Sequence, residues 1–184
     1  MFEVEQFIAA CRAALEESDA QGAINEIVKK AVSEPGQIIR ALGEPRLAGV
    51  DTVYRAPDLT ILNLRWGPHM DLHPHNHLMW AVIGIYGGSE DNTFYRRSED
   101  GLTQHGLKQL ATKDTIPLGD TIIHSVANPL DKITSAIHVY GGDFFDTPRS
   151  EWDPETFEEH PYDVEHTIRV FEESNRQLRE SAPE

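Results

Sequence analysis

The segment His73–His77 reads His-Pro-His-Asn-His and places three imidazoles within five residues. His75 and His77 are two residues apart, and side chains at that spacing point to the same face of a β-strand. Imidazole is a good ligand for Zn, Fe, Cu and Ni, so two imidazoles on one face can bind the same divalent ion. The spacing therefore predicts a metal site in this segment.

A third candidate ligand, His124, lies in the later strand-like segment 121–127, after the turn at Gly119-Asp120. Two ligands from a His-X-His pair and one from a distant strand leave coordination positions open for a substrate or for oxygen. A closed structural site would need a fourth protein ligand, and none is evident in the sequence. The histidines without such a context are predicted to be surface loop residues: His69, His73, His105, His160 and His166.

Other residues surround the three candidate ligands in a recognisable order: Trp66-Gly67, Gly84, Gly87, Gly119-Asp120 and Asn128. With the histidines they resemble the two halves of the cupin motif, and more narrowly the cysteine dioxygenase type of thiol dioxygenase. The segment 75–80 is most similar to the bacterial 3-mercaptopropionate dioxygenase branch. The resemblance covers about residues 50 to 145, roughly half of the chain.

The resemblance implies Fe(2+) bound by His75, His77 and His124, and an oxidoreductase that uses O2 to oxidise a small thiol to its sulfinate. Cysteine and 3-mercaptopropionate are the substrates that it suggests. The acidic ligand that ordinary cupins carry a few residues after the second histidine is absent here, which fits the three-histidine branch. Two alternatives stay open: a cupin whose metal acts as a Lewis acid in isomerisation or hydrolysis, and a metal-dependent small-molecule binding protein without turnover.

The segment 135–140 supplies a second set of candidate residues. Ala136, His138 and Tyr140 alternate onto one face of a predicted strand. The family places a Ser-X-His-X-Tyr triad beside the iron, so the resemblance implies catalytic roles for His138 and Tyr140. The serine position is Ala136 here, and Ser135 points to the opposite face.

An arginine and a cysteine complete the comparison with the family. By its position Arg55 resembles the family arginine that binds a substrate carboxylate, and a guanidinium matches a carboxylate bidentately. Eukaryotic members also carry a cysteine–tyrosine crosslink. The single cysteine of this chain, Cys11, lies in a predicted helix that is far from Tyr140 in the sequence. Tyr140 is therefore not expected to form this crosslink.

The remaining pattern predicts helices at both ends and strands between them. Apolar residues recur at helical spacing over 2–32, with a break near Ser18-Asp19, and a further helix is predicted from Pro35 to Leu42. The predicted strands are 59–66, 78–86, 93–97, 106–111, 121–127 and 133–140. A helix is predicted over 163–180. We therefore expect a mainly β cupin fold, a double-stranded β-helix or jelly roll, with flanking N- and C-terminal α-helices.

Composition narrows the expected partners. The chain of 184 residues fits one domain, divided into a helical segment at 1–45, a β-barrel core at 50–145 and an acidic C-terminal helix at 151–184. A net charge of −15 disfavours nucleic acid as a partner. No apolar run approaches the ~20 residues of a membrane span, and the N-terminus lacks the features of a signal peptide. A reducing cytoplasm is expected, and no oligomeric state is predicted.

Overall fold

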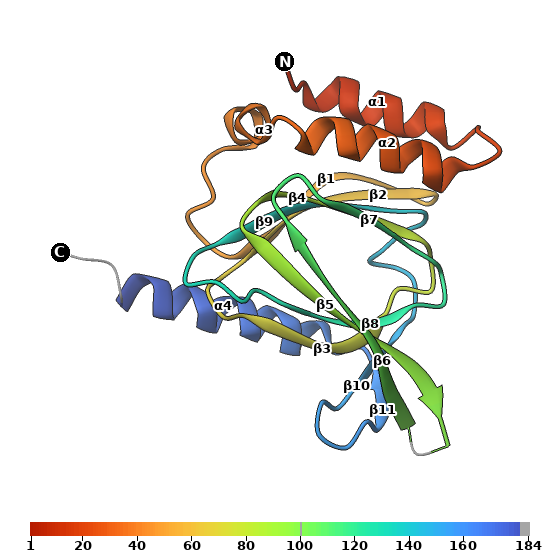
Figure 1. The fold of residues 1–184 in the computed structure, drawn as a ribbon, viewed down its shortest axis with the longest axis vertical. Coiled ribbons are helices and arrows are strands. Elements are labelled where there is room, and N and C mark those ends of the chain that lie inside the picture. The colour runs from red at the N-terminus through yellow and green to blue at the C-terminus, as the bar shows by residue number, and fades with distance from the viewer. Residues whose placement is uncertain (100, 181–184) are drawn as a thin grey trace.

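Two antiparallel β-sheets face each other in the computed structural model, which describes residues 1–99 and 101–180 (Figure 1). The first sheet has the order β1 (Gly49–Ala56), β2 (Leu59–Trp66), β9 (Thr134–Tyr140), β4 (Ala81–Gly87), β7 (Thr115–Leu118). The second has the order β11 (Glu159–Pro161), β10 (Ser150–Trp152), β3 (Asp71–Asn76), β8 (Ile123–Ala127), β5 (Ser89–Ser98), β6 (Gly101–Ala111). From β2 onward the chain passes back and forth between the sheets, which defines a double-stranded β-helix.

The three central strands of the first sheet, β2, β9 and β4, are buried on both faces. Every residue of β9 is buried, as is nearly every residue of β2, and the two strands pair from Thr60–Tyr140 to Trp66–Thr134. A strand covered on both sides often carries an almost continuous apolar run, as the Ala-Val-Ile-Gly-Ile-Tyr-Gly sequence of β4 does, whereas β2 and β9 each also bury polar residues. One face of the sheet is covered by helices, and the other lines the interior between the sheets, where the site lies.

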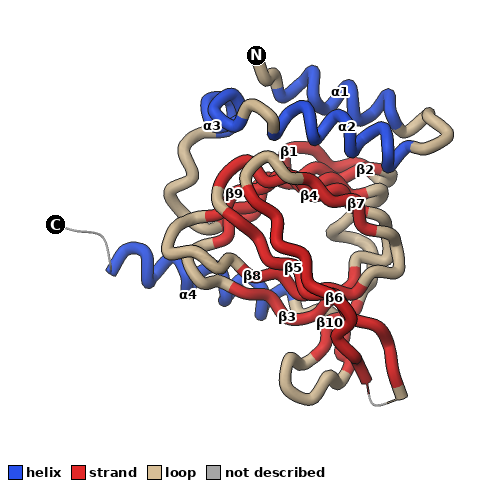
Figure 2. Tube along the Cα trace, in the orientation of Figure 1, coloured by secondary structure: helices blue, strands red, loops and turns tan. Residues whose placement is uncertain are grey.

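Three N-terminal helices cover the outer face of the first sheet (Figure 2). They are α1 (Val4–Ala14), α2 (Ala20–Val32) and α3 (Pro35–Leu42). The predicted break before α2 is confirmed, because the Asp19 side chain accepts a hydrogen bond from the Gly22 backbone N–H at 2.9 Å and caps the helix. At Gly84 an added Cβ would lie 2.4 Å from Val28, so this glycine permits the close packing of α2 on β4.

The C-terminal helix α4 (Val164–Glu180) lies along the other side of the molecule, near β3 (Figure 1). The Phe171 ring stacks on Trp66 with centroids 5.6 Å apart. The Asn175 side chain accepts a hydrogen bond from the Ala48 backbone N–H at 2.7 Å and donates one to the Ala48 carbonyl at 3.0 Å. These contacts hold α4 against the space between the two sheets.

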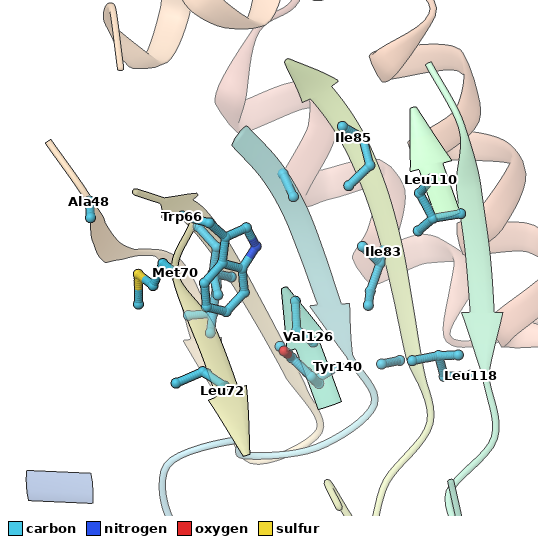
Figure 3. Packing of buried hydrophobic residues seen from close by; sticks show 14 of the residues in the cluster. Ala48, Trp66, Met70, Leu72, Ile83, Ile85, Leu110, Leu118, Val126 and Tyr140 are labelled. Atoms are coloured by element: carbon cyan, nitrogen blue, oxygen red, sulfur yellow. The ribbon is translucent and has the colours of Figure 1, made fainter. Parts of the chain in front are cut away.

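Side chains from both sheets fill the interior. Figure 3 shows two groups of them: Trp66, Leu72, Val126 and Tyr140 in one part, and Ile83, Ile85, Leu110 and Leu118 in another. The predicted mainly β class with flanking helices is confirmed. Five strands were not predicted: β1, β3, β7, β10 and β11. Within the described residues, no helix combines the length and the apolar character that a membrane crossing requires.

Candidate metal centre

The three histidines predicted to bind a metal lie together in the interior. His75 on β3 pairs in register with His124 on β8, and His77 follows immediately after the end of β3. His75, His77 and His124 are 6%, 3% and 1% exposed. Their candidate ligand atoms all lie within 4.8 Å of one another. The structure therefore brings together, from β3, the residue that follows it and β8, the set that the sequence pattern indicated.

The geometry of this cluster fits one metal ion. The Nε2 atom of His77 lies 3.3 Å from Nε2 of His75 and 3.3 Å from Nε2 of His124. Two nitrogens bound to one ion at about 2.1 Å lie about 3.0–3.4 Å apart, depending on the coordination angle. The opposite nitrogens of two rings are already engaged, because His75 Nδ1 meets the His73 carbonyl at 2.9 Å and His124 Nδ1 meets Asn92 Oδ1 at 2.8 Å. These contacts leave Nε2 free as the ligand atom.

Burial keeps the three imidazoles neutral at neutral pH. Burial lowers the pKa of His75 to about 4. The pKa values of His77 and His124 are also lowered well below the ordinary value, first by burial and then by the charge of neighbouring histidines. A metal-binding imidazole must be unprotonated. The cluster therefore needs no proton release from these rings to bind a cation near pH 7.

The backbone around His77 is shaped by a local turn and a side-chain bridge. Leu78 has a φ of 54°, in the left-handed region that branched and bulky residues avoid, and it ends the β3 segment before β4 begins at Ala81. Asn76, which precedes His77, is held by a hydrogen bond: its Oδ1 accepts from the Ser150 backbone N–H at 2.9 Å. This bridge fixes the histidine segment against the first residue of β10.

A wholly buried carboxylate, Glu90 on β5, adjoins the cluster through Asn92. Asn92 Nδ2 donates to Glu90 Oε1 at 2.9 Å, and Trp66 Nε1 donates to Glu90 Oε2 at 2.8 Å. Burial alone would raise the pKa of Glu90, but the contacts with His138, Asn92 and Trp66 outweigh it and lower the pKa. Glu90 is therefore a fixed negative charge, joined through Asn92 to the ring of His124.

His138 and Tyr140 lie on the interior face of β9, as their spacing predicted. His138 Nδ1 and the Tyr140 hydroxyl share a hydrogen bond of 3.0 Å, and the Tyr140 ring lies edge-on to His77 with centroids 5.1 Å apart. Burial raises the pKa of Tyr140, so the hydroxyl keeps its proton. The other nitrogen of His138, Nε2, lies 3.7 Å from Glu90 Oε2, which is an ion-pair distance but too long for a hydrogen bond. Glu90 is thus the polar group that faces His138.

A cavity of about 360 Å³ opens on this cluster. His75, His77, His124, His138 and Tyr140 all line it. Most of the remaining wall is apolar and comes from β2, β3, β8 and α4. A cavity of this size with a few convergent polar groups is the usual form of a small-molecule site.

Arg55 does not line this cavity. Its guanidinium forms a bidentate ion pair with Asp143, with Nε–Oδ1 and Nη2–Oδ2 distances of 2.9 Å, and lies over the Phe145 ring at 5.0 Å. The Arg55 side chain is 45% exposed. Its role as a substrate contact stays a prediction, and the ion pair with Asp143 does not favour it.

A second arginine, Arg149, does line the cavity and was not identified from the sequence. Its guanidinium lies 4.0 Å from the Phe144 ring centroid and 4.2 Å from that of Tyr162, and it donates to the Phe144 carbonyl. Its Nε is buried and has no hydrogen-bond partner among the described residues. The Tyr162 ring lies 5.9 Å from His75 and the Phe144 ring 6.1 Å from His77. Arg149 is thus a cation with an unused donor beside the cluster.

The five histidines predicted to be surface loop residues lie outside the cluster. The loop prediction is wrong for four of them, because they lie on β3, β6, β11 and α4: His73, His105, His160 and His166. His69 pairs with Asp131 at 2.6 Å, and the His73 ring lies 4.7 Å from that of His166. His105 and His160 are exposed. Cys11 is fully buried in α1, where burial raises the pKa of its thiol to about 12, so it is an inert packing residue.

Fold and site together define a double-stranded β-helix protein with a buried three-histidine site that could hold a metal ion. No family model matches the chain, and no curated protein matches it.

Similar solved structures include cupins. An RmlC-like cupin family protein from Methanocaldococcus jannaschii is 9% identical, with 54% of this chain and 84% of that chain covered and a TM-score of 0.45. A cupin superfamily protein from Desulfitobacterium hafniense is 11% identical, with 55% and 83% covered and a TM-score of 0.44. A protein with a double-stranded β-helix domain from Klebsiella pneumoniae is also 11% identical, with 54% and 76% covered and a TM-score of 0.44.

Proposed function

We propose that this protein is an iron(II)-dependent thiol dioxygenase that oxidises a thiol carboxylic acid to its sulfinate. The observation that carries the proposal is a cluster of three neutral imidazoles that opens on a cavity containing Arg149. The cluster includes no carboxylate, in line with the resemblance to the three-histidine branch. Fe(2+) combines a preference for imidazole with reactivity toward O2.

The reaction balances without a further reductant. A thiolate and one O2 give one sulfinate: two S–O bonds form, the O–O bond breaks, and the four electrons that reduce O2 come from sulfur. A ferrous ion held by His75, His77 and His124 would supply open coordination positions for both reactants. The residues of the chain orient and shield them, as preorganised polar groups do in a water-poor site.

Three side chains have separate roles in this proposal. Arg149 binds the carboxylate of the substrate, for which its unpaired Nε and planar guanidinium are suited. Tyr140, held by His138, hydrogen-bonds the reacting species at the histidine cluster. The apolar wall excludes bulk water, which strengthens both polar contacts.

The test is O2 uptake by protein loaded with iron under anaerobic, reducing conditions. We expect about one iron per chain and O2-dependent sulfinate formation from a thiol carboxylic acid, with 3-mercaptopropionate and cysteine in the first panel. Cysteamine, which has a thiol but no carboxylate, is the matched control and should react more slowly. An iron-loaded protein that consumes no O2 with any thiol would instead support a Lewis-acid cupin or a binding protein without turnover.

Tyr140→Phe should lower kcat and leave the iron content intact. The substitution removes only the hydroxyl that His138 holds, and a single positioned proton donor contributes ~10²–10⁴-fold. We expect a loss at or below the low end of that range, because Ala136 replaces the triad serine of the family. Tyr95→Phe is the control, since Tyr95 bonds to Ser125 and does not line the cavity. Unchanged kcat in Tyr140→Phe would make Tyr140 a packing residue.

Ala136→Ser restores the residue type that the family carries at this position. Ala136 is fully buried and shares the interior face with His138, so the added hydroxyl lies on the correct side of β9. We expect activity that is equal to or higher than that of the parent protein, with iron content unchanged. A loss of iron on this substitution would show that the position serves packing beside the site rather than orientation of His138.

A further inference from the structure

We propose that the substrate is an apolar thiol acid: a monocarboxylate that carries an alkyl or aryl group larger than 3-mercaptopropionate and no amine. The inference that the substrate carries a thiol rests on the proposed function. The preference for an apolar carboxylate does not, because it follows from the shape and lining of the cavity alone.

The size of the cavity exceeds what a short thiol acid fills. Its volume is about 360 Å³, which corresponds to about 12 water molecules at ~30 Å³ each. 3-Mercaptopropionate has only six non-hydrogen atoms and would leave a large part of that space without contacts. Since the unfilled part is lined by carbon, ordered water has few partners there. A ligand with an apolar extension would fill it.

The polar groups of the cavity are few, and they include the histidines, Tyr140 and Arg149. Arg149 lies between Phe144 and Tyr162, and each of these rings adjoins a histidine of the cluster. The rest of the lining is mainly apolar and comes from both sheets and α4: Leu62, Leu64, Trp66, Leu72, Val126 and Phe171. A thiol and a carboxylate therefore find partners at the histidines and Arg149, and the rest of the molecule meets a mainly apolar lining.

The rim of the cavity is also apolar, although it faces solvent. Val50, Phe145, Val164 and Ile168 line the cavity and are 40%, 46%, 58% and 52% exposed. They make up four of the eight large hydrophobic side chains that are exposed among the described residues. Exposed apolar side chains gathered around one opening mark an interaction site, and a ligand-binding groove is one form of such a site. A long apolar ligand would cover it.

The lining offers little to an ammonium group. Among the described residues that line the cavity, Glu172 is the one acidic side chain, and it is exposed on α4. The buried Glu90 is already paired with Trp66 and Asn92 and does not line the cavity. An amine beside Arg149 would meet a like charge and no acceptor carboxylate, which disfavours cysteine relative to an amine-free thiol acid.

The first experiment measures binding without turnover. Protein loaded with zinc, which does not react with O2, is titrated calorimetrically with propionate, hexanoate and octanoate. Burial of each methylene is worth about fourfold in affinity, so we expect octanoate to bind at least about 100-fold more tightly than propionate. Equal affinity for the three acids would overturn the proposal.

Two matched substitutions locate the effect on the exposed rim. Ile168→Glu places a charge at the apolar mouth and should weaken octanoate binding by about tenfold or more, with little effect on propionate. Arg169→Gln changes the net charge by the same amount on the neighbouring residue, which is exposed and outside the lining, and should leave both affinities unchanged. Equal weakening by both variants would attribute the effect to net charge and would contradict an apolar mouth.

A carboxylate test and a thiol series separate the two proposals. Arg149→Gln should reduce the preference of the zinc protein for octanoate over 1-octanol.

With iron-loaded protein, 2-benzyl-3-mercaptopropionate should give a higher kcat/KM than 3-mercaptopropionate, and cysteine a lower one. If 3-mercaptopropionate is the best substrate and larger thiols are worse, the apolar-substrate inference fails while the dioxygenase stands. If octanoate binds as expected but no thiol is oxidised, the dioxygenase fails and the apolar-acid site stands.

Discussion

His124→Ala should lose most of the bound iron. Only three side chains are available to hold the ion, and an open site has no spare ligand among the described residues. Loss of a partner that merely orients a ligand already costs about 10–100-fold in metal affinity, so loss of the ligand itself should cost more than about 100-fold. The measurement is iron content after anaerobic loading and desalting. His75→Ala and His77→Ala should behave in the same way.

The control for this series is His105→Ala, which removes an exposed imidazole on β6 and should keep its full iron content. Because His124 is buried, His124→Gln is needed beside the alanine variant. Glutamine fills more of the space, and thermal unfolding of the metal-free proteins then separates a lost ligand from a lost fold. Full iron content in a folded His124 variant would contradict the assignment of the site.

Part of the site could be predicted because two of its residues lie on a regular strand. The two-residue spacing of His138 and Tyr140 on β9 put both side chains on the interior face, as expected for a strand. β3 was missed for a physical reason. It carries Pro74 and several polar residues, and its pairing with β8 shifts register between Leu72 and His75, so neither composition nor alternation resembles an ordinary strand.

The residues that sequence reasoning missed depend on contacts between distant segments. Arg149 lies in an irregular segment, and its position follows from its packing against Phe144 and Tyr162. Glu90 and Asn92 alternate correctly on β5, but they are polar residues at buried positions. A periodic pattern assigns polar residues to the solvent face, so it places these two on the wrong side.

Glu90→Gln should weaken both the metal site and the fold. Glu90 is a carboxylate with no exposed surface, and it accepts hydrogen bonds from Trp66 and Asn92 while facing His138. Through Asn92 it fixes the ring of His124, and through His138 it adjoins the Tyr140 hydroxyl. One buried charge thus supports both a candidate ligand and the candidate proton donor.

The amide of glutamine cannot reproduce these contacts. A carboxylate accepts at both oxygens, whereas an amide has one oxygen and an NH2 group that faces a donor, either Trp66 Nε1 or Asn92 Nδ2. If Asn92 rotates to accept from the new amide, its own NH2 turns toward His124 Nδ1 and favours a proton on Nε2, the nitrogen needed for the metal. The substitution therefore either breaks the bond to Trp66 or shifts His124 to the wrong tautomer.

The expected cost of Glu90→Gln follows from these two outcomes. Loss of a buried hydrogen bond to a charged group should lower the free energy of unfolding by about 2 kcal/mol, and a misoriented His124 should weaken metal affinity by about 10–100-fold. Chelator competition measures the affinity, and urea unfolding of the metal-free protein measures the stability. Asp91→Asn is the matched control, because Asp91 is the next residue on β5, bonds to Gln109 at the surface and loses the same charge. A Glu90→Gln protein with parental metal affinity would show that His124 holds its orientation without the carboxylate.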